Sequence, residues 1–177
     1  GAGKTASLLA LVLLTPPSPR RTLVVAPNHL IDQWTACVRA ARLSERVLLL
    51  SFSELMREWD VHAAYETFET RNVAVCLRGR ELRSSPPSAV YEEEFQRVIV
   101  DEIQDVGADE SNKVVCAIRN VRRAHAWGAS GTPIKRTADD LVALLAAIDL
   151  RLWDSGGART TPRELPAHEQ RELMERV

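Results

Sequence analysis

Short runs of apolar residues alternate along the chain with longer stretches in which apolar residues recur every third or fourth position. The short runs favour buried strands, and the longer stretches favour helices with one apolar face. The predicted strands comprise residues 22–26, 47–50, 72–77, 97–100 and 124–129. The predicted helices comprise residues 5–14, a segment that begins at Asn28, and residues 111–121 and 138–148.

Local signals define two of these helices more closely. Pro16 and Pro17 end the first helix, because proline cannot continue the hydrogen-bond pattern of a helix. Asn28 is of a type that caps helices, and we expect it to cap the second one. The apolar face of that helix carries Trp34, which we interpret as a packing anchor; stacking on a nucleic-acid base is the alternative. The other members of this face are Leu30, Ile31, Cys37 and Val38.

Strands that alternate with helices indicate parallel βαβ units with right-handed connections. We therefore predict an α/β fold of three layers, in which helices cover both faces of a mainly parallel sheet. Residues 1–154 would form this domain, and residues 155–177 a linker followed by a short polar helix. The chain begins with Gly1 and not with methionine, so we expect the domain to be truncated at its N-terminus.

The composition excludes some classes of protein. The 177 residues are 45% hydrophobic and 27% charged, which is ordinary for a soluble globular protein. The longest apolar run, residues 8–14, is too short to cross a bilayer, so we expect no membrane partner. The net charge of -1 neither favours nor excludes nucleic acid. The cysteines are far apart and predict reduced thiols, not a metal site.

The sequence opens on a pattern that fits phosphate binding. GAGKT, residues 1–5, matches the last part of the phosphate loop GxxxxGK[ST]. Gly1 and Gly3 would let backbone N–H groups close around phosphate oxygens. Lys4 would bridge the β- and γ-phosphates of ATP, and the Thr5 hydroxyl would ligate Mg²⁺. A chance match is the alternative for this motif taken alone.

Two adjacent carboxylates follow the clearest of the predicted strands. Asp101 and Glu102 come directly after VIV, residues 98–100, at the end of the strand where parallel sheets bind ligands. Asp101 would hold Mg²⁺, and Glu102 would orient or deprotonate the attacking water. The alternative is a pair that merely ends the strand and caps the next turn.

A turn rich in hydroxyl groups, SGTP at residues 130–133, follows the last predicted strand. Ser130 and Thr132 could sense the γ-phosphate there, and an ordinary Gly-Pro turn is the alternative. The order of the three motifs favours the chemical interpretation. All three lie at the ligand-binding ends of predicted strands. They follow one another in the order and at a spacing that suit a nucleotide hydrolase.

Together these motifs resemble the first RecA-like lobe of superfamily 2 helicases, which are P-loop NTPases, and most closely the Swi/Snf-type DNA translocases. The resemblance extends from Gly1 to about Asp154. GAGKT is similar to motif I of that family, VVAPNHLIDQW (24–34) to motif Ia, VIVDE (98–102) to motif II and SGTPI (130–134) to motif III. DLVALL, residues 140–145, resembles a helix that follows motif III in these translocases. The presence of this helix distinguishes them from DEAD-box RNA helicases.

The chain departs from the family pattern at two places. Motif II reads DEIQ where most relatives carry DEAH, so Gln104 replaces a histidine. Gln104 can still hydrogen-bond toward motif III, but it cannot titrate as histidine does. The variant resembles members of the family that carry a RING finger, and its continuation resembles the DExxD pattern of superfamily 1. Residues 47–55 and 72–82 are both candidates for motif Ib, but neither has the family's usual threonine-tyrosine pair, so we assign no nucleic-acid contact there.

The resemblance implies an enzyme that uses ATP and Mg²⁺ to move along double-stranded DNA. Its catalytic residues would be Lys4, Asp101 and Glu102. The residues that couple the γ-phosphate to domain movement would be Gln104, Ser130 and Thr132. A second RecA-like lobe of the same chain would supply an arginine finger, so these 177 residues alone should bind ATP weakly and hydrolyse almost none. The family implies a nuclear location, otherwise a cytoplasmic one, with chromatin or ubiquitin-pathway proteins as further partners.

Two other interpretations stay open. The chain could be a lobe of a superfamily 1 or RNA-directed helicase, which the type of the second lobe would reveal. It could also be a degenerate lobe that serves as a scaffold without enzymatic activity. If the lobe is a scaffold, Lys4→Ala in the full-length protein would leave cellular activity unchanged. Loss of activity would support the interpretation as a motor.

Overall fold

The computed structural model describes residues 3–75, 88–106 and 112–132, together with a few positions further along the chain. Those positions are Leu145, Ile148, Leu152, Trp153, Arg159, Thr160 and His168. The helix predicted at residues 138–148 therefore lies outside the described residues except at two positions. Most of the predicted linker and polar helix, residues 155–177, also lies outside the described residues.

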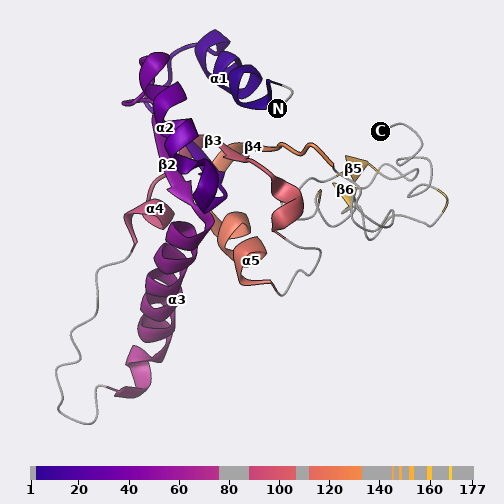
Figure 1. The fold of residues 1–177 in the computed structure, drawn as a ribbon. Coiled ribbons are helices and arrows are strands. Elements are labelled where there is room, and N and C mark those ends of the chain that lie inside the picture. Colours follow the sequence, from indigo (N-terminus) through magenta and orange to yellow (C-terminus); the bar gives the residue numbers. More distant parts are fainter. Residues whose placement is uncertain are drawn as a thin grey trace.

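Four parallel strands form the main sheet of the described residues, in the order β2-β1-β3-β4 (Figure 1). The strands are β1 (Thr22–Ala26), β2 (Val47–Ser51), β3 (Phe95–Val100) and β4 (Arg123–Gly128). In the register of the sheet, Val24 of β1 lies between Leu49 of β2 and Ile99 of β3. A separate antiparallel pair consists of β5 (Leu152–Trp153) and β6 (Arg159–Thr160). The main strands confirm four of the predicted ones.

Helices connect these strands and lie on both sides of the main sheet. They are α1 (Lys4–Leu14), α2 (Ile31–Ala40), α3 (Phe52–Val75), α4 (Ala89–Glu92) and α5 (Lys113–Asn120). Two short 3-10 helices are η1 (Asn28–Leu30) and η2 (Ile103–Asp105). Figure 1 shows α1 and α2 on one side of the sheet and α3, α4 and α5 on the other. No helix within the described ranges is long and apolar enough to cross a membrane.

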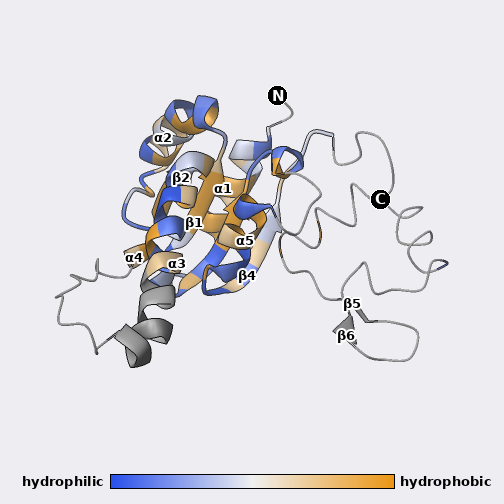
Figure 2. Cartoon of the chain, turned by 90° about the horizontal axis from the view of Figure 1, so that it is seen from below, coloured by the Kyte–Doolittle hydropathy of each residue, from blue (hydrophilic) through white to orange (hydrophobic). Residues whose placement is uncertain are grey.

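Alternating side chains of the strands fill two separate cores, because successive residues of a strand point to opposite faces. The side chains that pack with α3, α4 and α5 include Leu23, Val25, Val98 and Val100. Those that pack with α1 and α2 include Val24, Ala26 and Ile99. Figure 2 shows hydrophobic strands flanked by helices that carry both hydrophilic and hydrophobic residues. The prediction of a three-layer α/β/α fold with a mainly parallel sheet is confirmed.

Two local predictions are wrong. Residues 72–75, predicted as the start of a strand, belong to α3, and residues 76–77 lie outside the described part. A short apolar run fits a helix as well as a strand, and here a helix that begins at Phe52 continues through it. Asn28 does not cap the second helix, because its side-chain amide donates to Ser53 Oγ at 2.8 Å and α2 begins only after η1.

Candidate functional site

The candidate site lies at the edge of the sheet where the parallel strands end. β3 ends at Val100 and is followed directly by Asp101 and Glu102, while β4 leads into the turn at residues 130–132. α1 begins at the same edge, since Lys4 contacts Glu102. Three segments that are far apart in the sequence therefore meet at the end of the sheet where parallel folds bind ligands.

Glu102 is at the centre of this meeting point. Its Oε1 accepts a hydrogen bond from Lys4 Nζ at 2.5 Å, and its other carboxylate oxygen accepts one from the side-chain amide of Gln104. The backbone N–H of Gly131 also contributes to the lowered pKa of Glu102. A Cβ atom added to Gly131 would lie 3.3 Å from Lys4 Nζ, so a side chain there would crowd the ammonium group. The residues of three separate motifs are thus in direct contact.

The environment of Glu102 favours its ionised form. Its pKa is lowered from 4.5, first by the hydrogen bond from Lys4 and then by the one from Gln104, while partial burial acts in the opposite direction. The backbone of Glu102 is left-handed, with φ 47° and ψ 47°, which is uncommon for a residue other than glycine. This conformation turns the chain from β3 into η2. Strained positions of this kind cluster at functional sites.

Asp101 is held by Trp34, a residue that the sequence predicts as a packing anchor, with base stacking as the alternative. Trp34 of α2 is 0% exposed, and its Nε1 donates to Asp101 Oδ2 at 2.9 Å. The other carboxylate oxygen accepts the backbone N–H of Glu102 at 2.9 Å. The packing role of Trp34 is confirmed, and its burial leaves no face for a base. The bond itself was missed, although a buried indole N–H usually requires an acceptor and Asp101 is a buried carboxylate nearby.

Four other predicted site residues are on the segments that meet at this cluster: Gly3, Thr5, Ser130 and Thr132. Gly3 has φ 74°, a left-handed conformation that glycine adopts readily, and it directly precedes α1. Thr5 lies in the first turn of α1. Ser130 is half-buried, and its hydroxyl accepts the backbone N–H of Thr132 at 3.0 Å, which closes a tight turn. Gly1 lies outside the described residues.

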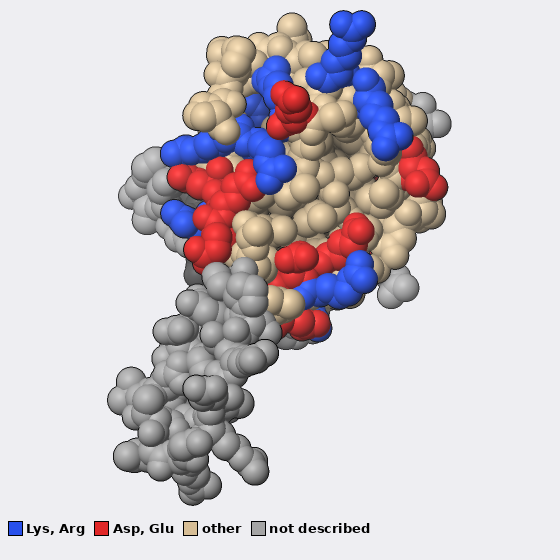
Figure 3. Space-filling view, turned by 90° about the vertical axis from the view of Figure 1, so that its left-hand side faces the viewer, with Lys and Arg blue, Asp and Glu red and all other residues tan. Residues whose placement is uncertain are grey.

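A hollow lies at the same edge of the sheet, beyond β1 and β2. It has a volume of about 550 Å³. It is lined by Asn28, Ile31, Asp32, Ser51, Ser53, Glu54 and Arg57. Asp32 and Glu54 lie in the first turns of α2 and α3, so carboxylates already occupy the positive ends of these helix dipoles. On the side of the molecule shown in Figure 3, Lys and Arg are interspersed with Asp and Glu. We assign no ligand to this hollow.

The three-layer fold and the lysine, acid pair and hydroxyl-rich turn at its ligand-binding edge define a P-loop NTPase lobe of the RecA-like type. The chain belongs to the family of the SNF2-related domain, whose family model matches residues 1–175.

Relatives by sequence are similar over most of this chain but are much longer. The DNA repair protein rad5 of Aspergillus fumigatus is 26% identical over an alignment of 150 residues, and the match covers 78% of this chain and 12% of that protein. The DNA repair protein rad8 of Schizosaccharomyces pombe is 28% identical over an alignment of 145 residues, and the match again covers 78% of this chain and 12% of the relative. A probable global transactivator of Orgyia pseudotsugata multicapsid polyhedrosis virus is 24% identical, and the match covers 89% of this chain and 31% of that protein.

One solved structure with a similar fold is the Sulfolobus solfataricus SWI2/SNF2 ATPase core in complex with dsDNA. The TM-score is 0.53 at 18% sequence identity, and the match covers 85% of this chain and 30% of that chain. This likeness supports the fold. The chain therefore corresponds to a minor part of each relative, between 12% and 31% of its length.

Proposed function

We propose that this chain is the ATP-binding lobe of a motor that couples ATP hydrolysis to movement along double-stranded DNA. The observation that carries the proposal is the contact between Lys4 and Glu102, which joins the phosphate-loop lysine to the acid of motif II at 2.5 Å. Membership in the SNF2-related family supports it. Residues 1–154 would form the lobe, and residues 155–177 would lead out of it.

ATP and Mg²⁺ are the cofactors that fit these residues. The carboxylate of Asp101 accepts one hydrogen bond from Trp34 and one from the backbone N–H that follows, while an ionised carboxylate has about four acceptor sites. It therefore has capacity for Mg²⁺ or for water on the metal, and the Thr5 hydroxyl would be a second ligand. Lys4 and the backbone around Gly1 and Gly3 would hold the phosphates. When bound, Mg²⁺ would neutralise charge that develops during phosphoryl transfer.

Nucleotide binding would require Lys4 to exchange partners. The ammonium group is paired with Glu102 in the structure, and the phosphates of ATP would compete for the same group. Departure of Lys4 removes the largest cause of the lowered pKa of Glu102. Glu102 would then be released from this ion pair and could orient or deprotonate the attacking water. The carboxylate would therefore be held by Lys4 until nucleotide arrives.

Gln104, Ser130 and Thr132 would couple the γ-phosphate to movement of the domain. Gln104 already bonds to Glu102, and the turn at residues 130–132 reaches the same carboxylate through Gly131. Amides and aliphatic hydroxyls do not titrate near neutral pH. This coupling would therefore be independent of pH between about 6 and 8, in contrast to a site that relies on histidine.

The partners that we propose rest on the relatives. The solved structure with the same fold is an ATPase core in complex with dsDNA, and the two fungal relatives are named DNA repair proteins. We therefore propose double-stranded DNA as the track and the nucleus as the location. Chromatin or ubiquitin-pathway proteins would bind through other regions. A second RecA-like lobe would supply the arginine finger, worth roughly 10³–10⁵ in rate, so residues 1–177 alone would hydrolyse almost no ATP.

Two substitutions in the full-length protein separate nucleotide binding from hydrolysis. Lys4→Ala should weaken binding of a fluorescent ATP analogue and abolish hydrolysis, because the phosphates lose their cation. Glu102→Gln should keep binding and reduce hydrolysis by about 100-fold or more, because the base is lost while the shape is retained.

The matched control is Glu94→Gln, the same change in a carboxylate that pairs with Arg20 at 3.0 Å near the opposite end of β3. It should leave binding and hydrolysis within about twofold of the wild type, as exposed substitutions usually do. Hydrolysis at the wild-type rate by Glu102→Gln would refute the assignment of Glu102.

A further inference from the structure

α1 begins with Lys4 but packs only lightly on the sheet. Most residues of its sequence, KTASLLALVLL, are apolar, yet only Leu9 and Val12 are buried. Leu13 and Leu14 are 51% and 85% exposed. Because so little of the helix is buried, the position of its first turn depends strongly on polar links to the rest of the domain.

Two arginines bind the C-terminal end of α1, which is the end opposite the candidate site. Arg97 of β3 is 4% exposed, and its Nη1 donates to the carbonyl of Leu11 at 3.3 Å. Arg46, which precedes β2, donates from Nη2 to the carbonyls of Val12 at 3.0 Å and Thr15 at 3.3 Å. The carbonyl of Leu11 also accepts the backbone N–H of Thr15 at 3.2 Å and the Thr15 hydroxyl at 2.6 Å. The last carbonyls of a helix carry the negative end of its dipole, so cations suit this position.

Arg97 also connects α1 to the strand that leads to the acid pair. It shares a face of β3 with Ile99, which packs in the same core as α1. The helix runs opposite to the strand, since its first residue contacts Glu102 beyond the end of β3 and its last turn contacts Arg97 near the start. Helix and strand are thus joined at both ends, by Lys4 with Glu102 and by Arg97 with Leu11.

A guanidinium group is a costly choice if the position only fills the core. Burial lowers the pKa of Arg97, and the nearby positive charge of Arg46 lowers it further. The Nε atom of Arg97 has no hydrogen-bond partner within the described part of the chain. A well-packed apolar side chain of similar size would avoid these costs. The charge therefore points to a role in which its bonds to α1 matter.

We propose that Arg97, assisted by Arg46, is a positioning residue that holds α1 in place while Lys4 changes partner. The inference rests on the proposed function, in which Lys4 leaves Glu102 for the phosphates of ATP. Once that ion pair is broken, the arginine bonds are the polar links that remain between α1 and the rest of the domain, among those described. Without them the helix would shift, and its first turn would no longer face the acid pair across the bound phosphates.

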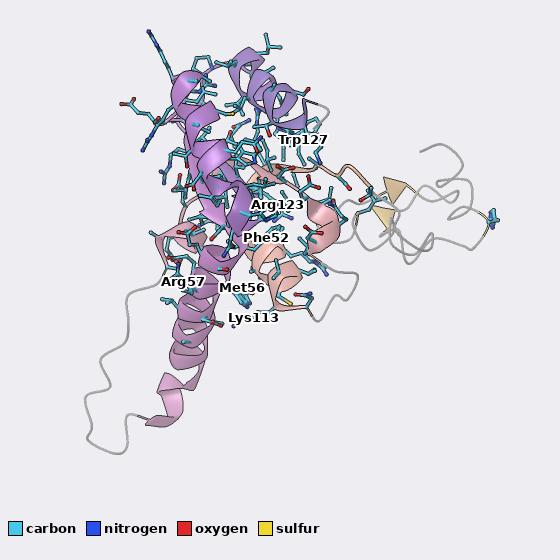
Figure 4. All side chains as sticks on the ribbon, viewed as in Figure 1. Phe52, Met56, Arg57, Lys113, Arg123 and Trp127 are labelled. Carbon is cyan, nitrogen blue, oxygen red and sulfur yellow. The ribbon has the colours of Figure 1, made fainter. Side chains whose placement is uncertain are left out.

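The test uses the full-length protein and compares two arginines that each bind the end of a helix. Arg97→Met removes the guanidinium group and keeps an unbranched apolar stem. Arg123→Met is the matched control, because Arg123 lies beside α5 (Figure 4) and donates to the carbonyls of Ile118 at 2.8 Å and Arg119 at 3.1 Å. α5 carries none of the predicted site residues. Lys4→Ala is the reference for loss of nucleotide binding.

Arg97→Met should raise the dissociation constant for ATP with Mg²⁺ roughly 10- to 100-fold and lower kcat to a similar extent, since misplacement by about 1 Å can cost that much. Arg123→Met should leave both within about twofold, even where thermal unfolding shows a similar loss of stability in the two variants. Arg97→Lys, which keeps a cation near the helix end, should recover part of the affinity. Should Arg97→Met not fold, Arg46→Met is compared with the same control.

Equal effects of Arg97→Met and Arg123→Met on nucleotide binding would overturn the inference, because the loss would then follow stability alone. Unchanged binding in Arg97→Met would overturn it as well, provided that Lys4→Ala abolishes binding in the same assay. If Lys4→Ala has no effect, the proposed function itself fails, and the positioning role fails with it for that separate reason.

Discussion

Asp101 depends on Trp34, a side chain that reaches it from the helical layer. The indole N–H is the donor to Asp101 Oδ2, at 2.9 Å in a fully buried position. A bond of this kind fixes the orientation of a carboxylate in the way that residues behind a metal ligand usually do. Trp34 should therefore influence Mg²⁺ binding without touching the metal.

We predict that Trp34→Phe destabilises the protein by roughly 1.5–3 kcal/mol, because a buried carboxylate loses a donor. ATP hydrolysis should fall more at low than at saturating Mg²⁺, since Asp101 is the proposed metal ligand. Trp127→Phe is the control, as Trp127 is 44% exposed on β4. An unchanged dependence on Mg²⁺ concentration in Trp34→Phe would contradict the proposed role.

The lowered pKa of Glu102 gives stability a defined dependence on pH. Because the folded pKa lies below 4.5, ionised Glu102 stabilises the folded state fully above pH 4.5, and this contribution is lost as the pH falls through the folded pKa. Below pH 4.5 the wild type should therefore lose stability faster than Glu102→Gln. The pKa of Glu54 is also lowered, but Glu54 is present in both proteins, so its contribution to the pH dependence cancels in the comparison. Urea unfolding at several pH values measures the difference, and parallel curves would contradict the prediction.

Residues that belong to a motif could be singled out from the sequence, and residues that act through contacts could not. Lys4, Glu102 and Gln104 stand at fixed spacings that chemistry requires, and the structure brings them into contact. The bonds from Trp34 and Arg97 depend on which side chains meet across two layers. Hydrophobic periodicity indicates the face on which a residue lies, but not its partner.

At the scale of elements, α3 begins at a capping box. Glu54 Oε2 accepts the backbone N–H of Ser51 at 2.7 Å, and Ser51 Oγ accepts the backbone N–H of Glu54 at 3.1 Å. This SxxE pattern can be read in the sequence and signals a helix that starts after Ser51. The strand predicted at residues 72–77 rested on an apolar run alone, which is why it missed the continuation of this helix.

We predict that Ser51→Ala lowers the free energy of unfolding by about 1 kcal/mol, because the helix loses the acceptor for one of its first N–H groups. Ser53→Ala makes the same change two residues further on, where the hydroxyl bonds to exposed Asn28, and should cost less than about 0.5 kcal/mol. Chemical denaturation of the two variants provides the comparison. Equal losses would show that the cap contributes nothing particular to α3.

At the scale of the whole molecule, alternation of strands and helices was enough to predict three layers around a parallel sheet. It could not give the strand order β2-β1-β3-β4, because that order depends on which connections pass over a neighbouring strand. The order matters for the site. It sets β3 beside β4, so that the acid pair after Val100 lies next to the turn at residues 130–132.

The central claim is that Lys4 and Glu102 belong to an ATP site whose turnover drives movement on DNA. The most direct measurement is the rate of ATP hydrolysis by the full-length protein with and without double-stranded DNA, for the wild type and for Lys4→Ala. We predict that DNA stimulates hydrolysis by the wild type and that Lys4→Ala abolishes hydrolysis under both conditions. DNA-stimulated hydrolysis that persists in Lys4→Ala, or a wild type that does not hydrolyse ATP, would contradict the claim.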